Sequence, residues 1–111
     1  MFYDCNKLVN LNMSSFDTHN VTNMNKIWYN CRNLARFDLS NFDTSKVTEM
    51  EYSFYACHGM NTLILGGKFA FVGNTYSIPL SSWRNSSGEI FDSDGTMSNI
   101  PSNVADVYTK M

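Results

Sequence analysis

The sequence predicts an α/β solenoid in which each stacked unit contributes one helix and one strand of a parallel sheet, closed by a β-rich C-terminal cap. Three observations predict this fold. The cysteines Cys5, Cys31 and Cys57 stand 26 residues apart. Apolar residues recur at helical spacing ahead of Cys31 and Cys57, and they alternate as in a strand after every cysteine. The last third of the chain carries turn signals and alternating aromatic residues but no repeat.

The repeat is visible when residues 1–26 are placed over residues 27–52. The triplet Phe-Asp-Thr then falls on itself at 16–18 and 42–44, and the tyrosines, cysteines and several apolar positions also coincide. A third copy begins after residue 52 and fades near residue 67. One such unit cannot cover its own apolar side, so neighbouring units are expected to stack. We therefore divide the chain into a solenoid over 1–67 and a cap over 68–111.

Helices are predicted over 21–31 and 47–57. In both segments apolar residues recur at i, i+3, i+7 and i+10, which places them on one face of a helix. The positions are Val21, Met24, Trp28 and Cys31 in one unit, and Val47, Met50, Phe54 and Cys57 in the next. Gly59 follows the second segment, where a residue in the left-handed conformation often ends a helix.

Strands are predicted after the cysteines, where three segments fit the leucine-rich-repeat pattern L-x-x-L-x-L. They begin at Leu8, Leu34 and Met60. Alternation directs the second and third apolar residues of each pattern inward and the residues between them outward. The exposed face of a stacked sheet is a common ligand surface, so the outward positions are the candidate binding site. They are Asn10, Asn12, Arg36, Asp38, Thr62 and Ile64.

The segment 68–111 is predicted to cover the open end of the array. Aromatic and aliphatic residues alternate over 69–83, and a last strand is expected at 105–108. An alternative is a separate carbohydrate-binding module in which Tyr76 and Trp83 are exposed stacking platforms.

The repeat resembles that of the BspA-like leucine-rich-repeat surface proteins of bacteria, a family also seen in mycoplasma lipoproteins. The residues that carry the resemblance are Met1-Phe2, Cys5, Leu8, Leu11, Ser14, Phe16-Asp17-Thr18, Val21-Thr22 and Met24, with their second copy 26 residues later. The resemblance covers residues 1 to about 67. It implies a secreted or surface-displayed interaction module without enzymatic activity. Because no signal peptide or sorting motif is visible, we expect the chain to be a C-terminal fragment of a longer protein.

Composition and spacing argue against several other functions. The net charge of −2 disfavours nucleic-acid binding, and no apolar run is long enough to insert into a membrane. The cysteine spacing offers no close pair for zinc, so the cysteines are expected to be buried, although a disulfide between neighbouring units stays open. Neither His19 nor His58 belongs to a triad motif. No catalytic residue, metal or cofactor is predicted.

The run Asp92-Ser93-Asp94-Gly95 resembles half of a calcium-binding loop, but the twelfth position is Asn103 instead of a glutamate. A hairpin turn at Asp94-Gly95 is therefore favoured over a calcium site.

The predicted function is binding or adhesion at the bacterial cell surface, with a host or community surface protein or glycan as the partner. The alternative is a structural stalk or cap of a longer surface protein whose missing repeats carry the binding. As a fragment, the chain would expose at its first unit apolar surface that a preceding unit normally covers. We therefore expect an isolated fragment to form a homodimer through Phe2, Leu11 and Met13.

Overall fold

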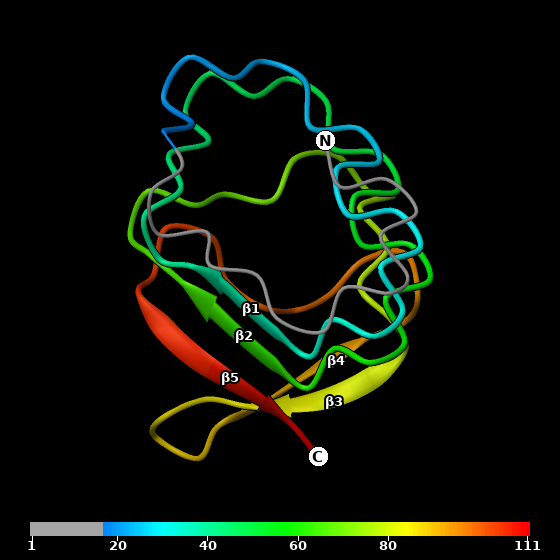
Figure 1. The fold of residues 1–111 in the computed structure, drawn as a ribbon. Helices are drawn as coiled ribbons and strands as arrows, with labels where there is room; N and C mark the ends of the chain where they lie inside the picture. The colour runs from blue at the N-terminus through cyan, green and yellow to red at the C-terminus, as the bar shows by residue number, and fades with distance from the viewer. Residues whose placement is uncertain (1–16) are drawn as a thin grey trace.

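The computed structural model describes residues 17–111, and within that part it contains one mixed five-stranded sheet and no helix. The strand order is β1-β2-β5-β3-β4. The strands are β1 (Arg36–Leu39), β2 (Thr62–Leu65), β3 (Ser81–Arg84), β4 (Ile90–Ser93) and β5 (Asp106–Lys110). Figure 1 shows the sheet on one side of the molecule and a stack of turns on the other.

The predicted α/β solenoid is therefore wrong: the described fold is all-β and its sheet is mixed. Only β1 and β2 pair in parallel, with a register that joins residues 26 apart, such as Arg36 and Thr62. β5 runs antiparallel to β2 and to β3, and β3 and β4 form an antiparallel hairpin. The final strand, predicted at 105–108, lies at 106–110.

The two predicted helices instead contain runs of consecutive turns, at 25–30 and 51–56. We call the whole segments the first turn segment (21–31) and the second turn segment (47–57). Lys26 and Asn30 have φ values of 57° and 63°, and Tyr52 and Ala56 repeat these values at 55° and 61°. A positive φ is incompatible with a right-handed helix. Because each segment has two such residues only four positions apart, no right-handed helix can form across it.

The backbone hydrogen bonds confirm that these segments are not helical. The N–H groups of Lys26, Trp28 and Asn30 donate to carbonyls of the second turn segment, at N···O distances of 2.9, 3.0 and 2.8 Å. The second turn segment donates onward in the same manner, from Tyr52 and Phe54 to residues 75 and 76. Donors that a helix would use internally therefore join one segment to the next. The apolar face predicted from the spacing is nevertheless buried, apart from Val21, which is half-buried.

The Phe-Asp-Thr triplet also connects neighbouring segments. The Thr18 hydroxyl accepts a hydrogen bond from the Asp43 N–H at 2.9 Å, and the Thr44 hydroxyl accepts one from the Ala70 N–H at 2.8 Å. The Asp43 carboxylate accepts a bond from the Ser45 N–H inside its own turn. The recurrence of the triplet thus reflects a structural requirement of the stack.

The core lies between the sheet and the turn segments and is dominated by aromatic rings. Trp28 stacks on Phe54 at a centroid distance of 5.0 Å and contacts Phe37 edge-on. Cys31 and Cys57 are buried, as the sequence predicted, and burial raises the pKa of the Cys57 thiol to about 12.

Gly59 was predicted to end a helix in the left-handed conformation, but its backbone does not adopt a positive φ. A Cβ at this position would lie 2.5 Å from the carbonyl oxygen of Arg32. The glycine is therefore required by the close approach of two backbone segments.

The predicted turn at Asp94-Gly95 is present, and Asp94 organises it. Its carboxylate accepts hydrogen bonds from the N–H groups of Thr96 and Met97 and from the Thr96 hydroxyl, at 2.8–2.9 Å. Together these bonds lower the pKa of Asp94 to about 2, and the bond from the Met97 N–H contributes most to the shift.

We expect this turn to lose stability as the pH falls. The folded-state pKa of Asp94 lies below the unfolded value of about 3.9, so the stabilisation is present above about pH 4 and is lost as the pH falls toward 2. An NMR titration of the side-chain carboxyl carbons should give a midpoint near 2 for Asp94. A midpoint near 4 would show that the carboxylate does not accept these bonds in solution.

Candidate functional site

The predicted sheet-face residues lie on β1 and β2, apart from Asn10 and Asn12, which fall outside the described residues. Arg36 is exposed on β1 and forms an ion pair with Asp38 at 3.8 Å. Asp38 also accepts bonds from the N–H and hydroxyl of Ser40, and the hydroxyl bond is the main reason why its pKa is lowered. Thr62 and Ile64 are half-buried beside them. The two charges on this face thus satisfy each other.

A different surface gathers exposed aromatic rings on the turn segments. We call it the tyrosine face, and it consists of Lys26, Tyr29, Tyr52 and Tyr55. Tyr29 and Tyr55 occupy the same position of successive repeats, and their rings stack at a centroid distance of 5.1 Å. The Tyr52 ring meets Tyr55 edge-on at 5.8 Å, and the Lys26 ammonium lies 5.6 Å from the centre of the Tyr29 ring.

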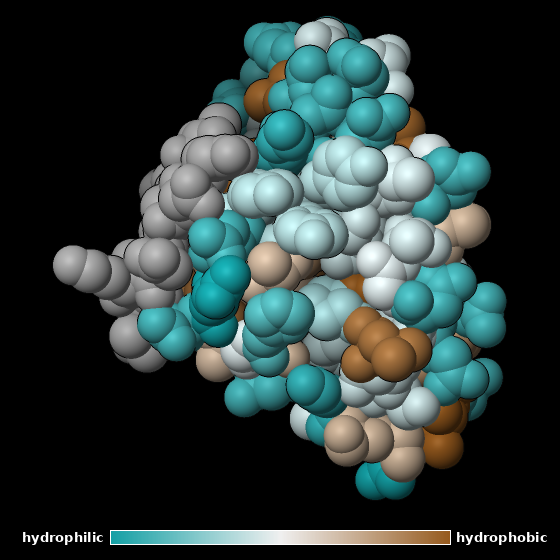
Figure 2. All heavy atoms as spheres, turned by 90° about the vertical axis from the view of Figure 1, so that its right-hand side faces the viewer, coloured by the Kyte–Doolittle hydropathy of each residue, from teal (hydrophilic) through white to brown (hydrophobic). Residues whose placement is uncertain are grey.

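The tyrosine face is open to solvent although its rings are mutually packed. The exposed fractions are 41% for Tyr52 and 47% for Tyr55. Figure 2 looks onto the turn segments, and side chains of intermediate hydropathy gather in the middle of this view, with hydrophilic ones above them and hydrophobic ones below. Rings held by stacking lose little conformational freedom when a partner binds, which makes such a surface suited to recognition.

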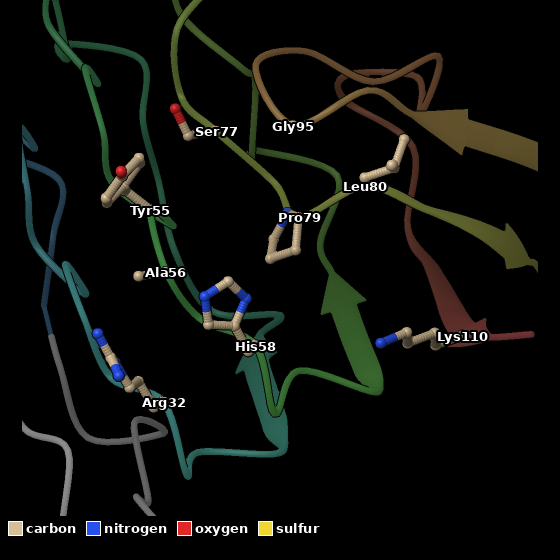
Figure 3. A pocket seen from close by; sticks show the side chains of 9 residues that line it. All are labelled: Arg32, Tyr55, Ala56, His58, Ser77, Pro79, Leu80, Gly95 and Lys110. Carbon is tan, nitrogen blue, oxygen red and sulfur yellow. The ribbon is translucent and has the colours of Figure 1, made fainter.

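A pocket of about 410 Å³ adjoins the tyrosine face, and Tyr55 belongs to both. We call it the basic pocket because three basic side chains line it, namely Arg32, His58 and Lys110. The remaining lining residues are Ala56, Ser77, Pro79, Leu80 and Gly95. Figure 3 shows Arg32 and His58 side by side on neighbouring turns, with Lys110 reaching toward them from the end of β5.

Neither surface was predicted from the sequence, although the repeat contains a signal for both. Tyr29 and Tyr55 coincide under the 26-residue shift, as do Arg32 and His58. Residues at equal repeat positions become spatial neighbours when the units stack. Lys110 carries no such signal, because it reaches the pocket only through the pairing of β5 with β2.

The alternative stacking platforms, Tyr76 and Trp83, are buried, with exposed fractions of 3% and 0%. The Tyr76 hydroxyl accepts a bond from the Ser98 N–H, and the Trp83 indole donates to the Ser93 hydroxyl. The carbohydrate-binding role suggested for these two residues is therefore wrong. His19 and His58 are exposed.

Comparison with known families gives one match. Residues 1–93 match the family described as "Mycoplasma protein of unknown function, DUF285". The chain belongs to this family. No curated protein and no solved structure was found to match it.

Membership of the DUF285 family agrees with the resemblance to BspA-like surface proteins at a coarse level, since members of that group carry the same family. A leucine-rich repeat is not shown by the match. The matched range contains the tyrosine face and most of the basic pocket, whereas Gly95 and Lys110 lie beyond it. Among residues 17–111, none belongs to a helix long and apolar enough to cross a membrane.

Proposed function

We propose that this chain is a non-enzymatic binding module of a bacterial surface protein and that it holds its partner through the tyrosine face. The partner is a protein or glycan of a host or of a neighbouring cell, and the module acts outside the cell. The observation that carries the proposal is the cluster of three tyrosine rings on the turn segments. Tyr55 stacks on Tyr29 and meets Tyr52 edge-on, and the rings of Tyr52 and Tyr55 are exposed. Tyrosine is among the residues most enriched where proteins bind their partners.

Two further observations support this assignment. The family match is consistent with a surface protein. The adjacent Cys57 and His58 do not form a nucleophilic pair, because the Cys57 thiol is buried, its pKa is raised to about 12, and it donates to the Trp28 carbonyl. A nucleophilic cysteine requires a lowered thiol pKa and access to substrate.

The tyrosine face is favoured over the sheet face because of how their polar groups are partnered. On β1, Arg36 and Asp38 neutralise each other. The tyrosine face has no carboxylate among its members and presents ring area directly to solvent. Burying apolar ring area on binding releases water and favours the complex, whereas an exposed ion pair contributes little to the free energy of binding.

We expect the variant Tyr52→Ala/Tyr55→Ala to lose binding at least about tenfold, or about 1.4 kcal/mol. The unmodified protein would be screened against extracellular-matrix proteins and a glycan array. The affinity for each hit would then be measured for the unmodified protein and for the double variant. Circular dichroism and a thermal melt would establish that the variant is folded.

The matched control is Arg36→Glu/Asp38→Lys, which reverses both charges of the sheet face. It should retain the affinity of the unmodified protein. Loss of binding in this control alone would place recognition on the sheet face. A screen without hits, combined with binding by a longer chain that carries upstream repeats, would favour the structural stalk or cap.

A further inference from the structure

We propose that the basic pocket binds an anionic saccharide, whose carboxylate or sulfate group is held by Arg32, His58 and Lys110 and whose ring packs on Tyr55. This inference rests on the proposed function and names the ligand chemistry for the part of the surface next to the tyrosine face. The volume of about 410 Å³ lies within the range of small-molecule sites.

The charge of the pocket is the first argument. None of its nine lining residues is acidic, although the whole chain has a net charge of −2. Within the described part of the chain, the ion pairs involve other residues, namely His19 with Asp17 and Arg36 with Asp38. Among residues 17–111, Arg32 and Lys110 therefore bring positive charge to one hollow without a neutralising carboxylate. Such a hollow attracts anions.

The orientation of Arg32 is the second argument. Its Nε donates to the Asn30 side-chain oxygen at 2.5 Å, which holds the guanidinium by one edge. The terminal nitrogens have no hydrogen-bond partner among residues 17–111 and form the fork that suits carboxylate and sulfate oxygens. His58 occupies the equivalent position of the next repeat, and the close backbone contact at Gly59 keeps the two turns together.

The wall formed by Tyr55 is the third argument and favours a sugar over a simple anion. Tyr55 has an exposed fraction of 47%, and its ring is held in place by Tyr29 and Tyr52. Pro79 and Leu80 line the opposite part of the hollow. An apolar wall beside a cationic one matches a ligand with an apolar ring face and a charged substituent.

The test compares three sugars that differ only at C6: glucose, glucuronate and glucose 6-sulfate. Inorganic sulfate and a hexaglutamate peptide serve as ligands with charge but without a sugar ring. Binding would be followed by ¹⁵N NMR titration of the whole chain. At least one charged sugar should bind at least about tenfold more tightly than glucose, sulfate and the peptide, with shifts at residues 32, 55, 58 and 110.

Variants then assign the site. Arg32→Gln and Lys110→Gln should each weaken binding of the charged sugar at least about fivefold. Arg36→Gln removes a comparable exposed charge from the sheet face and should leave the affinity unchanged. Both pocket side chains are exposed, so folding is expected to be preserved, and the NMR spectrum itself reports it.

The inference would be overturned if glucose or sulfate bound as tightly as the charged sugars, or if the peptide bound more tightly than they do. It would also be overturned if Arg36→Gln weakened binding of the charged sugar as much as the pocket variants, or if no charged sugar bound. The proposed function is judged separately. If an array hit requires Tyr52 and Tyr55 but neither Arg32 nor Lys110, the module binds as proposed and the anionic-sugar site is wrong.

Discussion

Replacing Trp28 with alanine is expected to destabilise the protein by about 3–5 kcal/mol, because it removes a large buried ring from the centre of the core. Trp28 is fully buried and contacts three aromatic rings, those of Phe37, Phe42 and Phe54. A small domain is stable by only about 5–15 kcal/mol, so this change removes a large share of the total.

Chemical denaturation of the purified variant measures this effect. Trp28→Phe is the matched control, since it retains a ring beside Phe54 and also removes an indole N–H that has no partner among the described residues. Trp28→Phe should lower the free energy of unfolding much less than Trp28→Ala. An equal loss of stability in the two variants would mean that the aromatic stack does not hold the turn segments to the sheet.

Replacing Gly66 with alanine is expected to cost about 3 kcal/mol or more, because two backbone segments meet at this position. A Cβ on Gly66 would lie 2.1 Å from the carbonyl oxygen of Ser40 and 2.9 Å from its carbonyl carbon. Both contacts are with backbone, so no side chain can move aside. The end of β2 must therefore separate from the chain that follows β1.

The neighbouring glycine supplies the control. A Cβ on Gly67 meets nothing within 4 Å, and its φ is not positive. Gly67→Ala should therefore be neutral or slightly stabilising. Thermal melts of the two variants compare them directly. A similar melting temperature for both would contradict the close stacking of residues 40 and 66.

The inward positions of β1 and β2 could be predicted because strand alternation depends on the chain's own sequence. Phe37 and Leu39 are buried on β1, and Leu63 and Leu65 are buried on β2. The register of this pair follows from the 26-residue period, since stacking units of equal length joins equivalent residues.

The turn segments could not be predicted, because apolar residues at i, i+3 and i+7 face one side in a helix and also in a run of tight turns. What separates the two is where the N–H groups donate, and that depends on the neighbouring unit. The positive φ values at Tyr52 and Ala56 leave no trace in the sequence, since these residue types seldom adopt that conformation.

The candidate site was missed for a related reason. The outward strand positions are predicted because the exposed face of a stacked sheet is a common ligand surface, but exposure alone does not distinguish a ligand surface from a solvated one. The recurrence of tyrosine at 29 and 55 is a stronger signal, since an aromatic ring kept on an exposed turn is not explained by the core.

The most direct test of the tyrosine face is an NMR spectrum of the protein with labelled tyrosine ring carbons, recorded with and without its strongest ligand from the binding screen. Tyr29, Tyr52 and Tyr55 report on the proposed surface, whereas Tyr76 and Tyr108 are buried internal controls. We predict that the signals of the first three shift on binding and that those of Tyr76 and Tyr108 do not. Unshifted tyrosines together with shifted amides on β1 and β2 would place recognition on the sheet face and contradict the proposal.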